Sequence, residues 1–397
     1  MKKGYFLIVL MVLFSITGCK KNSDTVKLGF IGPLTGDYAS YGVMMSDAVK
    51  IAVDEKNATG GIDGKKIVLI AEDSEGKIEK ANNAIEKLSS IDKIYGLIGG
   101  VFSSESLAVA PRAQAEKILM CSPSATHKDL TSKGNFIFRN VLSDQLQAIV
   151  FAKYTKNILK LNKVAILYIK NDYSQGLADD FKNEFEKIGG SIVASESGLP
   201  QDKDFKTQLT KIKTSGAQAL YIPNYVAEMA QILEQKTQLG LNMKVLSADG
   251  FSNPEIFELA GDNAVDVLFS NSTEDIAKDN AKDVFVKKYS DLYSIPPDAF
   301  SLNSYDIAVL MINAIENVYN QSSDSEKASL LLDREKIRSV FHATSDYQGV
   351  SGTISFLENG DASKNVGVFM SVKNGTQYEF KQIESYRITN NELEEIK

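Results

Sequence analysis

The segments of this chain alternate between two hydrophobic patterns, and that alternation constrains the fold more than any other feature. Short apolar runs typical of buried strands, such as 27–31 and 163–169, are each followed by a longer stretch with apolar residues at helical spacing. Strands that alternate with helices favour parallel sheets covered by helices on both faces. The pattern forms two series that separate near 139–143. We therefore expect an α/β protein with two doubly wound, parallel-sheet lobes.

The expected elements can be placed along the chain from this pattern. The strands are predicted at 27–31, 66–71, 94–98, 118–121, 163–169, 191–194, 219–222 and 244–247. The helices are predicted at 42–57, 77–88, 104–116, 174–188, 203–214 and 226–240. Near the C-terminus the pattern changes. Two strands, at 349–356 and 366–373, are predicted to be joined by a hairpin turn at 358–361, which contains an Asn-Gly pair.

The first 18 residues have the layout of a secretory signal. Two lysines precede an apolar run over 5–14, and small residues then lead to Cys19. The run is too short for an ordinary transmembrane helix. A cysteine at this place resembles the signal of bacterial lipoproteins, which implies cleavage before Cys19 and acylation of its sulfur. The alternative is a plain secretory signal in which Cys19 is incidental.

Residues 19–26 are then the lipidated cysteine and a polar tether. We expect the body of the protein to lie outside the cytoplasm, on the periplasmic or cell-surface side of a bacterial membrane, which it touches only through its lipid.

Composition and motifs argue against several classes of function. The chain has 51 acidic and 44 basic residues and a formal charge of −7, so it lacks the basic excess of a nucleic-acid binder. It has two histidines and two cysteines, too few for a His-rich metal site or a disulfide scaffold. No phosphate-binding loop, dinucleotide fingerprint or nucleophile elbow occurs, and His127 has no activated nucleophile nearby in sequence. We expect no enzyme activity, no cofactor and no metal.

Several short motifs together resemble the Leu/Ile/Val-binding proteins of branched-chain amino-acid ABC transporters. They are Ile31-Gly32-Pro33-Leu34-Thr35-Gly36, Tyr41-Gly42, Ala52-Val53-Asp54-Glu55, Gly60-Gly61-Ile62 with Gly64-Lys65-Lys66-Ile67, Gly99-Gly100-Val101-Phe102-Ser103-Ser104, Ser122-Pro123-Ser124-Ala125-Thr126, Asn171-Asp172-Tyr173-Ser174-Gln175-Gly176, and Gly352-Thr353-Ile354-Ser355-Phe356 with Asn359-Gly360. The opening cluster is specific only when its pieces are taken together. The resemblance covers nearly all of 27–375.

The resemblance implies the type I periplasmic binding-protein fold, in which three crossing strands join two α/β lobes and the ligand lies in the cleft between them. The chain should cross between lobes near 143, 275 and 348. The N-terminal lobe is then 27–143 plus 276–348, and the C-terminal lobe is 144–275 plus 349–397.

Polar residues after two strands of the first lobe are candidates for holding a ligand carboxylate. Ser103 follows the strand at 94–98 and precedes a helix, where backbone amides and the helix dipole favour anions. This is also the edge at which open α/β sheets bind ligands. From the residues alone, Ser103 or the serine after it could equally be a helix N-cap. The resemblance assigns carboxylate binding to Ser103, with Ser124, Ala125 and Thr126 as a second ligand loop; their alternative is an ordinary turn after Pro123.

A ligand ammonium needs an ionised acceptor. Asp249 follows the strand at 244–247, where spacing alone indicates a solvated turn. The resemblance places it at a position that is acidic in amino-acid binders and often Glu, so the shorter Asp requires a closer approach of ligand or loop.

Aromatic residues are candidates for the wall of the ligand pocket. Tyr41, Tyr173, Tyr225 and Phe300 match ligand-lining positions of the family, while core packing is the alternative for each. Phe102 stands where some relatives carry a disulfide cysteine, so that bridge is absent here.

Together these features predict a lipid-anchored, monomeric solute-binding protein. It would capture a branched-chain or other apolar amino acid by hinged closure and deliver it to an ABC permease and ATPase on separate chains. The alternatives are another small amide or carboxylate ligand, or service to a sensory receptor instead of a permease.

Overall fold

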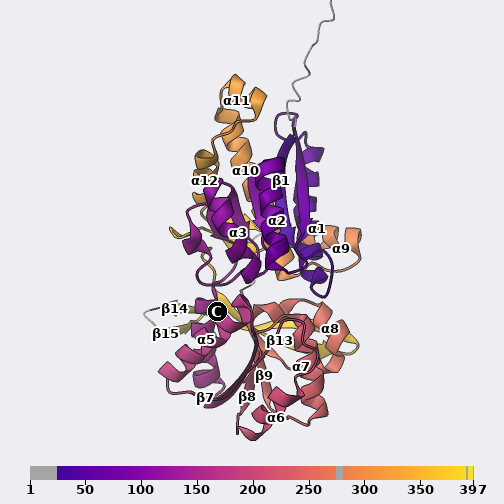
Figure 1. Cartoon of the computed structure of the whole chain (residues 1–397), viewed down its shortest axis with the longest axis vertical. Helices are drawn as coiled ribbons and strands as arrows, with labels where there is room; N and C mark the ends of the chain where they lie inside the picture. Colours follow the sequence, from indigo (N-terminus) through magenta and orange to yellow (C-terminus); the bar gives the residue numbers. More distant parts are fainter. Residues whose placement is uncertain (1–24, 274–279, 390–391, 397) are drawn as a thin grey trace, which may run out of the picture.

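The computed structural model describes residues 25–273, 280–389 and 392–396 of the chain. It consists of two α/β lobes stacked along the long axis of the molecule (Figure 1). The N-terminal lobe is built on a five-stranded sheet and the C-terminal lobe on an eight-stranded one. Within these ranges, no helix is both long and apolar enough to cross a membrane. The predicted Cys19 anchor lies outside the described residues.

Up to residue 247 the elements alternate as the sequence predicts, whereas the four consecutive helices between 281 and 342 were not predicted. The N-terminal lobe contains β1 (Thr25–Gly32), α1 (Ala39–Ala58), β2 (Lys66–Asp73), α2 (Ile78–Lys87), β3 (Gly96–Gly99), α3 (Ser103–Ala115), β4 (Leu119–Ser122) and β5 (Ile137–Arg139), and later α9 (Ala281–Tyr293), α10 (Ala299–Gln321), α11 (Asp324–Ser329), α12 (Arg334–His342), β11 (Tyr347–Gly349) and β12 (Gly352–Ile354). The C-terminal lobe contains α4 (Asp144–Lys153), β6 (Lys163–Ile169), α5 (Asp172–Lys187), β7 (Ser191–Gly198), α6 (Lys206–Thr214), β8 (Ala219–Tyr221), α7 (Val226–Gln238), β9 (Lys244–Ser247), α8 (Glu255–Ala260), β10 (Leu268–Ser272), β13 (Val366–Asn374), β14 (Gln377–Thr389) and β15 (Glu392–Glu395).

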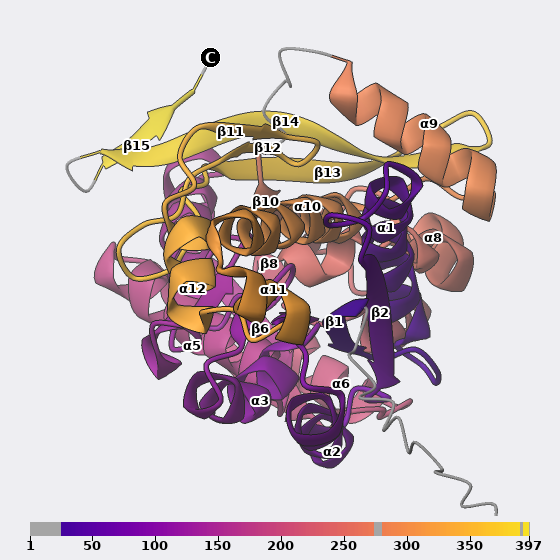
Figure 2. The same cartoon turned by 90° about the horizontal axis from the view of Figure 1, so that it is seen from above.

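The sheet of the N-terminal lobe is entirely parallel, in the order β2-β1-β3-β4-β5. Every residue of β3 and β4 is buried, as expected for central strands that helices cover on both faces. Seen from above, α1 and α10 lie on one side of this sheet and α2 and α3 on the other (Figure 2). The carboxyl ends of β3 and β4 therefore deliver their following loops to one edge.

The sheet of the C-terminal lobe is mixed, in the order β15-β14-β13-β10-β9-β8-β6-β7. Strands β6 to β10 are parallel, whereas β13, β14 and β15 are added antiparallel to one another and to β10. The predicted hairpin between 349–356 and 366–373 is wrong. The segment β11–β12 folds back on itself, and β13 pairs with β10 and β14 instead.

Three segments connect the lobes. The first lies at Ser143, which caps α4, and the second runs from the end of β10 towards α9 and includes residues outside the described ranges. The third lies later than the sequence places it. The backbone N–H groups of Val350 and Ser351 donate to the Asp306 carboxylate of α10 at 2.9 and 2.8 Å. Phe356 packs on Phe138 of the first sheet. These contacts keep 347–361 with the N-terminal lobe and favour a boundary near 362–366, where the prediction has 349.

Candidate functional site

Loops that follow strand ends in both lobes meet at the interlobe boundary and enclose a small buried pocket, here called the inner pocket. Six predicted site residues line it: Tyr41, Ser124, Tyr173, Tyr225, Asp249 and Phe300. Val101, Phe102 and Gly250 complete the lining. The first lobe supplies the segments after β3 and β4 together with α1 and α10, and the second supplies those after β6, β8 and β9. The pocket is therefore shared between the lobes.

Aromatic rings from both lobes interleave inside the inner pocket. The ring centroid of Tyr225 lies 4.2 Å from that of Phe102 and 4.7 Å from that of Tyr173, on which it stacks. Tyr41 meets Tyr225 edge to face at 5.7 Å. The remaining cavity is about 10 Å³, the space of about one water molecule. A molecule of amino-acid size can enter only when these rings move apart, which requires the lobes to separate or the side chains to rotate.

Two tyrosine hydroxyls fix the loop that carries Asp249. Tyr41 Oη donates to the Gly250 carbonyl at 2.5 Å and accepts from the Val226 N–H at 3.1 Å. Tyr173 Oη donates to Asp249 Oδ1 at 2.9 Å and accepts from the Gly250 N–H at 2.7 Å. A Cβ at position 250 would lie 2.7 Å from Tyr173 Oη, so this approach needs glycine. The bonds from Tyr41 also hold the two lobes together.

The inner pocket and its surroundings contain two carboxyl groups that are buried away from water. Burial raises the pKa of Asp249 to about 6, against the hydrogen bond from Tyr173, which lowers it. Nearby Asp144 is 1% exposed, and burial and then the charge of Asp249 raise its pKa well above the usual range. The Thr126 hydroxyl lowers the pKa of this carboxyl, but burial and the charge of Asp249 outweigh it. A cation placed here would stabilise the ionised forms of both buried acids.

The three remaining predicted residues are neighbours of the lining residues in sequence but do not line the inner pocket. Ser103 is the first residue of α3, and its Oγ accepts from the His127 N–H at 3.3 Å. Ala125 is buried and donates its N–H to Ser122 Oγ at 3.0 Å. Thr126 is fully buried, and its hydroxyl interacts with the Asp144 carboxyl. The N-cap of α3 is Phe102, so neither Ser103 nor Ser104 caps that helix.

Arg139 holds this loop in place, and the sequence analysis missed it. The side chain is 1% exposed, and Nη1 donates to the carbonyls of Thr126 and His127 at 2.9 and 2.8 Å. Its Nε bonds Asp361 at 2.6 Å. The analysis also missed Phe102 as a pocket residue and Asp144 as a buried acid. The position of Phe102, between a strand end and a helix start, was a usable signal. Asp144 had none, because it looks like an ordinary first-turn acid of a helix.

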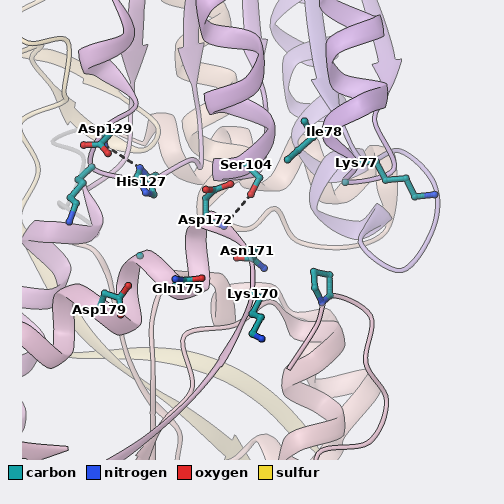
Figure 3. A pocket seen from close by; sticks show the side chains of 14 residues that line it. Lys77, Ile78, Ser104, His127, Asp129, Lys170, Asn171, Asp172, Gln175 and Asp179 are labelled. Atoms are coloured by element: carbon teal, nitrogen blue, oxygen red, sulfur yellow. Dashed lines mark hydrogen bonds between the residues drawn. The ribbon is translucent and has the colours of Figure 1, made fainter. Parts of the chain in front are cut away.

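An open cleft of about 670 Å³ lies on the outer side of the same boundary and is called the outer cleft here. Figure 3 shows that Ser104 reaches from α3 to the backbone of Asp172 in the other lobe, where its Oγ accepts from the N–H at 3.2 Å. His127 lies on this cleft, and its Nδ1 accepts from the Asp129 N–H at 3.2 Å. Burial lowers the pKa of His127. Lysines and aspartates dominate the remaining lining, so the outer cleft is polar where the inner pocket is aromatic.

Two α/β lobes joined by three segments, with a pocket shared between their facing loops, define a solute-binding protein. The sequence pattern of the periplasmic binding protein family matches residues 25–377. The chain belongs to this family.

Relatives in other bacteria match this chain over most of their length. The chain is 32% identical over 339 residues to Leu/Ile/Val-binding protein homolog 3 of Brucella melitensis, which spans 85% of this chain and 89% of the relative. It is 28% identical over 390 residues to the leucine-, isoleucine-, valine-, threonine- and alanine-binding protein of Pseudomonas aeruginosa, spanning 96% and 100% of the two chains.

Solved structures agree with this assignment. A leucine-binding protein, LivK, from Thermotoga maritima superposes with a TM-score of 0.79 at 31% identity, covering 90% of this chain and 97% of that one. The branched-chain amino acid transporter binding protein LivJ from Streptococcus pneumoniae, solved with isoleucine, gives a TM-score of 0.78 at 26% identity, covering 90% and 100%.

Proposed function

We propose that this chain captures a free amino acid with an apolar, branched side chain in its interlobe pocket and delivers it to an ABC importer. The observation that carries the proposal is the inner pocket, in which aromatic rings from both lobes surround the single lining carboxylate, Asp249. An apolar side chain fits the rings, and an ammonium fits the carboxylate. The similarity to a Leu/Ile/Val-binding protein homolog and to a branched-chain amino acid binding protein solved with isoleucine supports the same ligand class.

The predicted roles divide the ligand among three groups of residues. The ligand carboxylate is assigned to the hydroxyls of Ser103 and Thr126 and to backbone groups of Ser124 and Ala125. Asp249 takes the ammonium. Tyr41, Tyr173, Tyr225 and Phe300 take the side chain. The residues assigned to the ligand carboxylate lie in the first lobe, and Asp249 lies in the second. A bound amino acid would therefore tie the two lobes together.

Delivery requires the protein to stay at the membrane outside the cytoplasm. The family implies the extracytoplasmic location, and the signal at 1–18 with acylated Cys19 supplies the anchor in this proposal. The permease and ATPase are separate chains, and the binding protein works as a monomer.

A thermal-shift screen of the twenty amino acids on the mature protein tests the ligand class. Leucine, isoleucine or valine at about 100 times its Kd should stabilise the fold by roughly 2.7 kcal/mol. Amino acids with a charged side chain should not raise the melting temperature, because the rings offer no partner for the charge on that side chain. If no amino acid raises the melting temperature, the proposed ligand class is wrong.

A further inference from the structure

A second pocket lies across the molecule from the outer cleft and is called the aromatic pocket here. It has a volume of about 320 Å³ and is bounded by α8, β13 and β14 of the C-terminal lobe and by residues 296–299, which lead into α10 of the N-terminal lobe. Figures 1 and 2 both show α8 on the side of the lower lobe opposite α5, which borders the outer cleft. Its size falls at the lower end of the range for small-molecule sites, about 300–1,000 Å³.

Five aromatic residues line this pocket: Phe257, Phe269, Phe369, Tyr378 and Phe380. They make a continuous series, with centroids 5.2 Å apart for Tyr378 and Phe257, 4.7 Å for Phe257 and Phe380, and 5.3 Å for Phe380 and Phe269. The faces of such rings carry negative potential and attract cations. One cation already uses the series, because the Lys373 ammonium lies 5.1 Å from the centre of the Tyr378 ring.

The charged residues of the lining have one sign. Asp298 and Glu379 contribute carboxylates, and none of the described residues that line this pocket is Lys, Arg or His. Asp298 is 5% exposed. Its Oδ1 accepts from the N–H and hydroxyl of Ser301 at 2.7 and 2.5 Å, whereas Oδ2 has no partner among the described residues. Burial raises the pKa of this carboxyl to about 6. The raised pKa means that the partners of the ionised carboxylate do not fully offset the cost of burying its charge.

We propose that the aromatic pocket binds a small organic cation with an alkylated ammonium head. The rings would contact the alkyl groups, and the negative charges of Asp298 and Glu379 would attract the ammonium through the pocket wall. A bare metal cation fits the site poorly, since it needs several oxygen ligands and the wall is mostly carbon. An anion would meet two carboxylates. The inference does not depend on what the inner pocket binds, because the two pockets share no lining residue.

Choline and its uncharged carbon isostere, 3,3-dimethyl-1-butanol, provide a matched pair of probes. Calorimetric titration of the mature protein should give saturable binding of choline and at least about tenfold weaker binding of the alcohol, because only choline gains the cation–ring and carboxylate interactions. Equal binding of the two probes, or no choline binding at about 10 mM, overturns the proposal.

Variants locate the site. Asp298→Asn keeps the helix cap, since Asn caps as well as Asp does, and should weaken choline binding about tenfold or more. Phe380→Leu keeps apolar volume and should weaken it about fivefold. Asp249→Asn, in the inner pocket, should leave choline binding unchanged. Loss of choline binding in Asp249→Asn with retention in Asp298→Asn would place the cation in the inner pocket and overturn the proposal.

Discussion

Asp249 is a carboxylic acid with almost no access to water, and its side chain accepts a hydrogen bond from the Tyr173 hydroxyl. Its amide counterpart is a clean probe, because Asn keeps an oxygen that accepts the same bond. If Asp249 holds the ligand ammonium, Asp249→Asn removes the partner of a buried cation, a loss of about 3–5 kcal/mol. Amino-acid binding should weaken roughly a hundredfold or more by calorimetry. The exposed Asp262→Asn, in the same lobe, should bind normally. Binding within about threefold of the original by Asp249→Asn would refute the ammonium assignment.

The same substitution has a predicted effect on stability without ligand. The pKa of Asp249 rises from about 3.8 to about 6 on folding, so the folded state holds its proton where the unfolded state has lost it. Stability is therefore lost as pH rises through this window. Removing the charge should make Asp249→Asn more stable than the original protein above pH 6, by up to about 3 kcal/mol, with no gain below about pH 4. Urea unfolding at pH 4 and pH 8 measures this difference. An equal or lower stability of Asp249→Asn at pH 8 contradicts the prediction.

At the scale of elements, the start of α1 acts as a contact between the lobes. Tyr38 donates to Glu228, Ser40 donates to Glu255 at 2.5 Å, and Tyr41 bonds Gly250 and Val226.

Glycine at position 42 lets this helix approach the preceding loop, since a Cβ there would lie 2.0 Å from the Pro33 carbonyl oxygen. The local sequence therefore specifies the helix α1, and the side chains at the start of this helix make the contacts with the other lobe.

Tyr41→Phe removes two of these interlobe hydrogen bonds while keeping the ring. Each bond contributes about 0.5–1.5 kcal/mol, so amino-acid binding should weaken by roughly tenfold through a smaller closed population. Calorimetry measures the change. Tyr319→Phe is the matched control, because its hydroxyl bonds Asp63 within the N-terminal lobe at 3.3 Å, and its binding should stay unchanged. Equal affinities of the two variants would show that α1 does not hold the lobes closed.

Local periodicity predicted the alternating elements well, because each strand or helix is marked by its own hydrophobic pattern. Strands β6 and β9 fall where the pattern placed them, and α1 and α5 lie within a few residues of their predicted bounds. Strand pairing near the C-terminus could not be predicted in this way. The partners of β13 are β10, nearly a hundred residues earlier, and β14, and no local pattern encodes that choice. In the site, strand-end positions and family motifs found the lining residues, whereas Asp144 and Arg139 become visible only through burial.

At the scale of the whole molecule, attachment is proposed to depend on one atom, the sulfur of Cys19. No helix among the described residues spans a membrane, so the acyl groups would be the sole anchor. Cys19→Ala should leave the protein either soluble or unprocessed, as seen by fractionation and by the mass of its N-terminus. Processed protein that remains in the membrane fraction would contradict the lipoprotein proposal.

Closure of the two lobes is the motion that the architecture favours. Besides the interleaved rings of the inner pocket, the direct links across the boundary include ion pairs such as Lys203 with Asp37 at 3.0 Å and Lys128 with Asp180 at 2.6 Å. An exposed pair such as Lys203 with Asp37 contributes little, about 0–1 kcal/mol. Without ligand the lobes should therefore sample open arrangements about the three connecting segments, and a ligand that contacts both lobes should favour the closed one.

Small-angle X-ray scattering can test this closure directly. The radius of gyration should fall when the protein is saturated with an amino acid that stabilises it in the thermal-shift screen. Asp249→Asn at the same amino-acid concentration should keep the larger radius, because it should bind too weakly to draw the C-terminal lobe onto the N-terminal one.

The inner pocket makes the two outcomes distinguishable. Its rings leave only about 10 Å³, so a ligand must part them before the lobes can close around it. If closure is the response, the gain in interlobe contact outweighs this local expansion and the radius falls. A radius that stays the same or grows at saturation would mean that the ligand only displaces the rings, and hinged closure would be refuted.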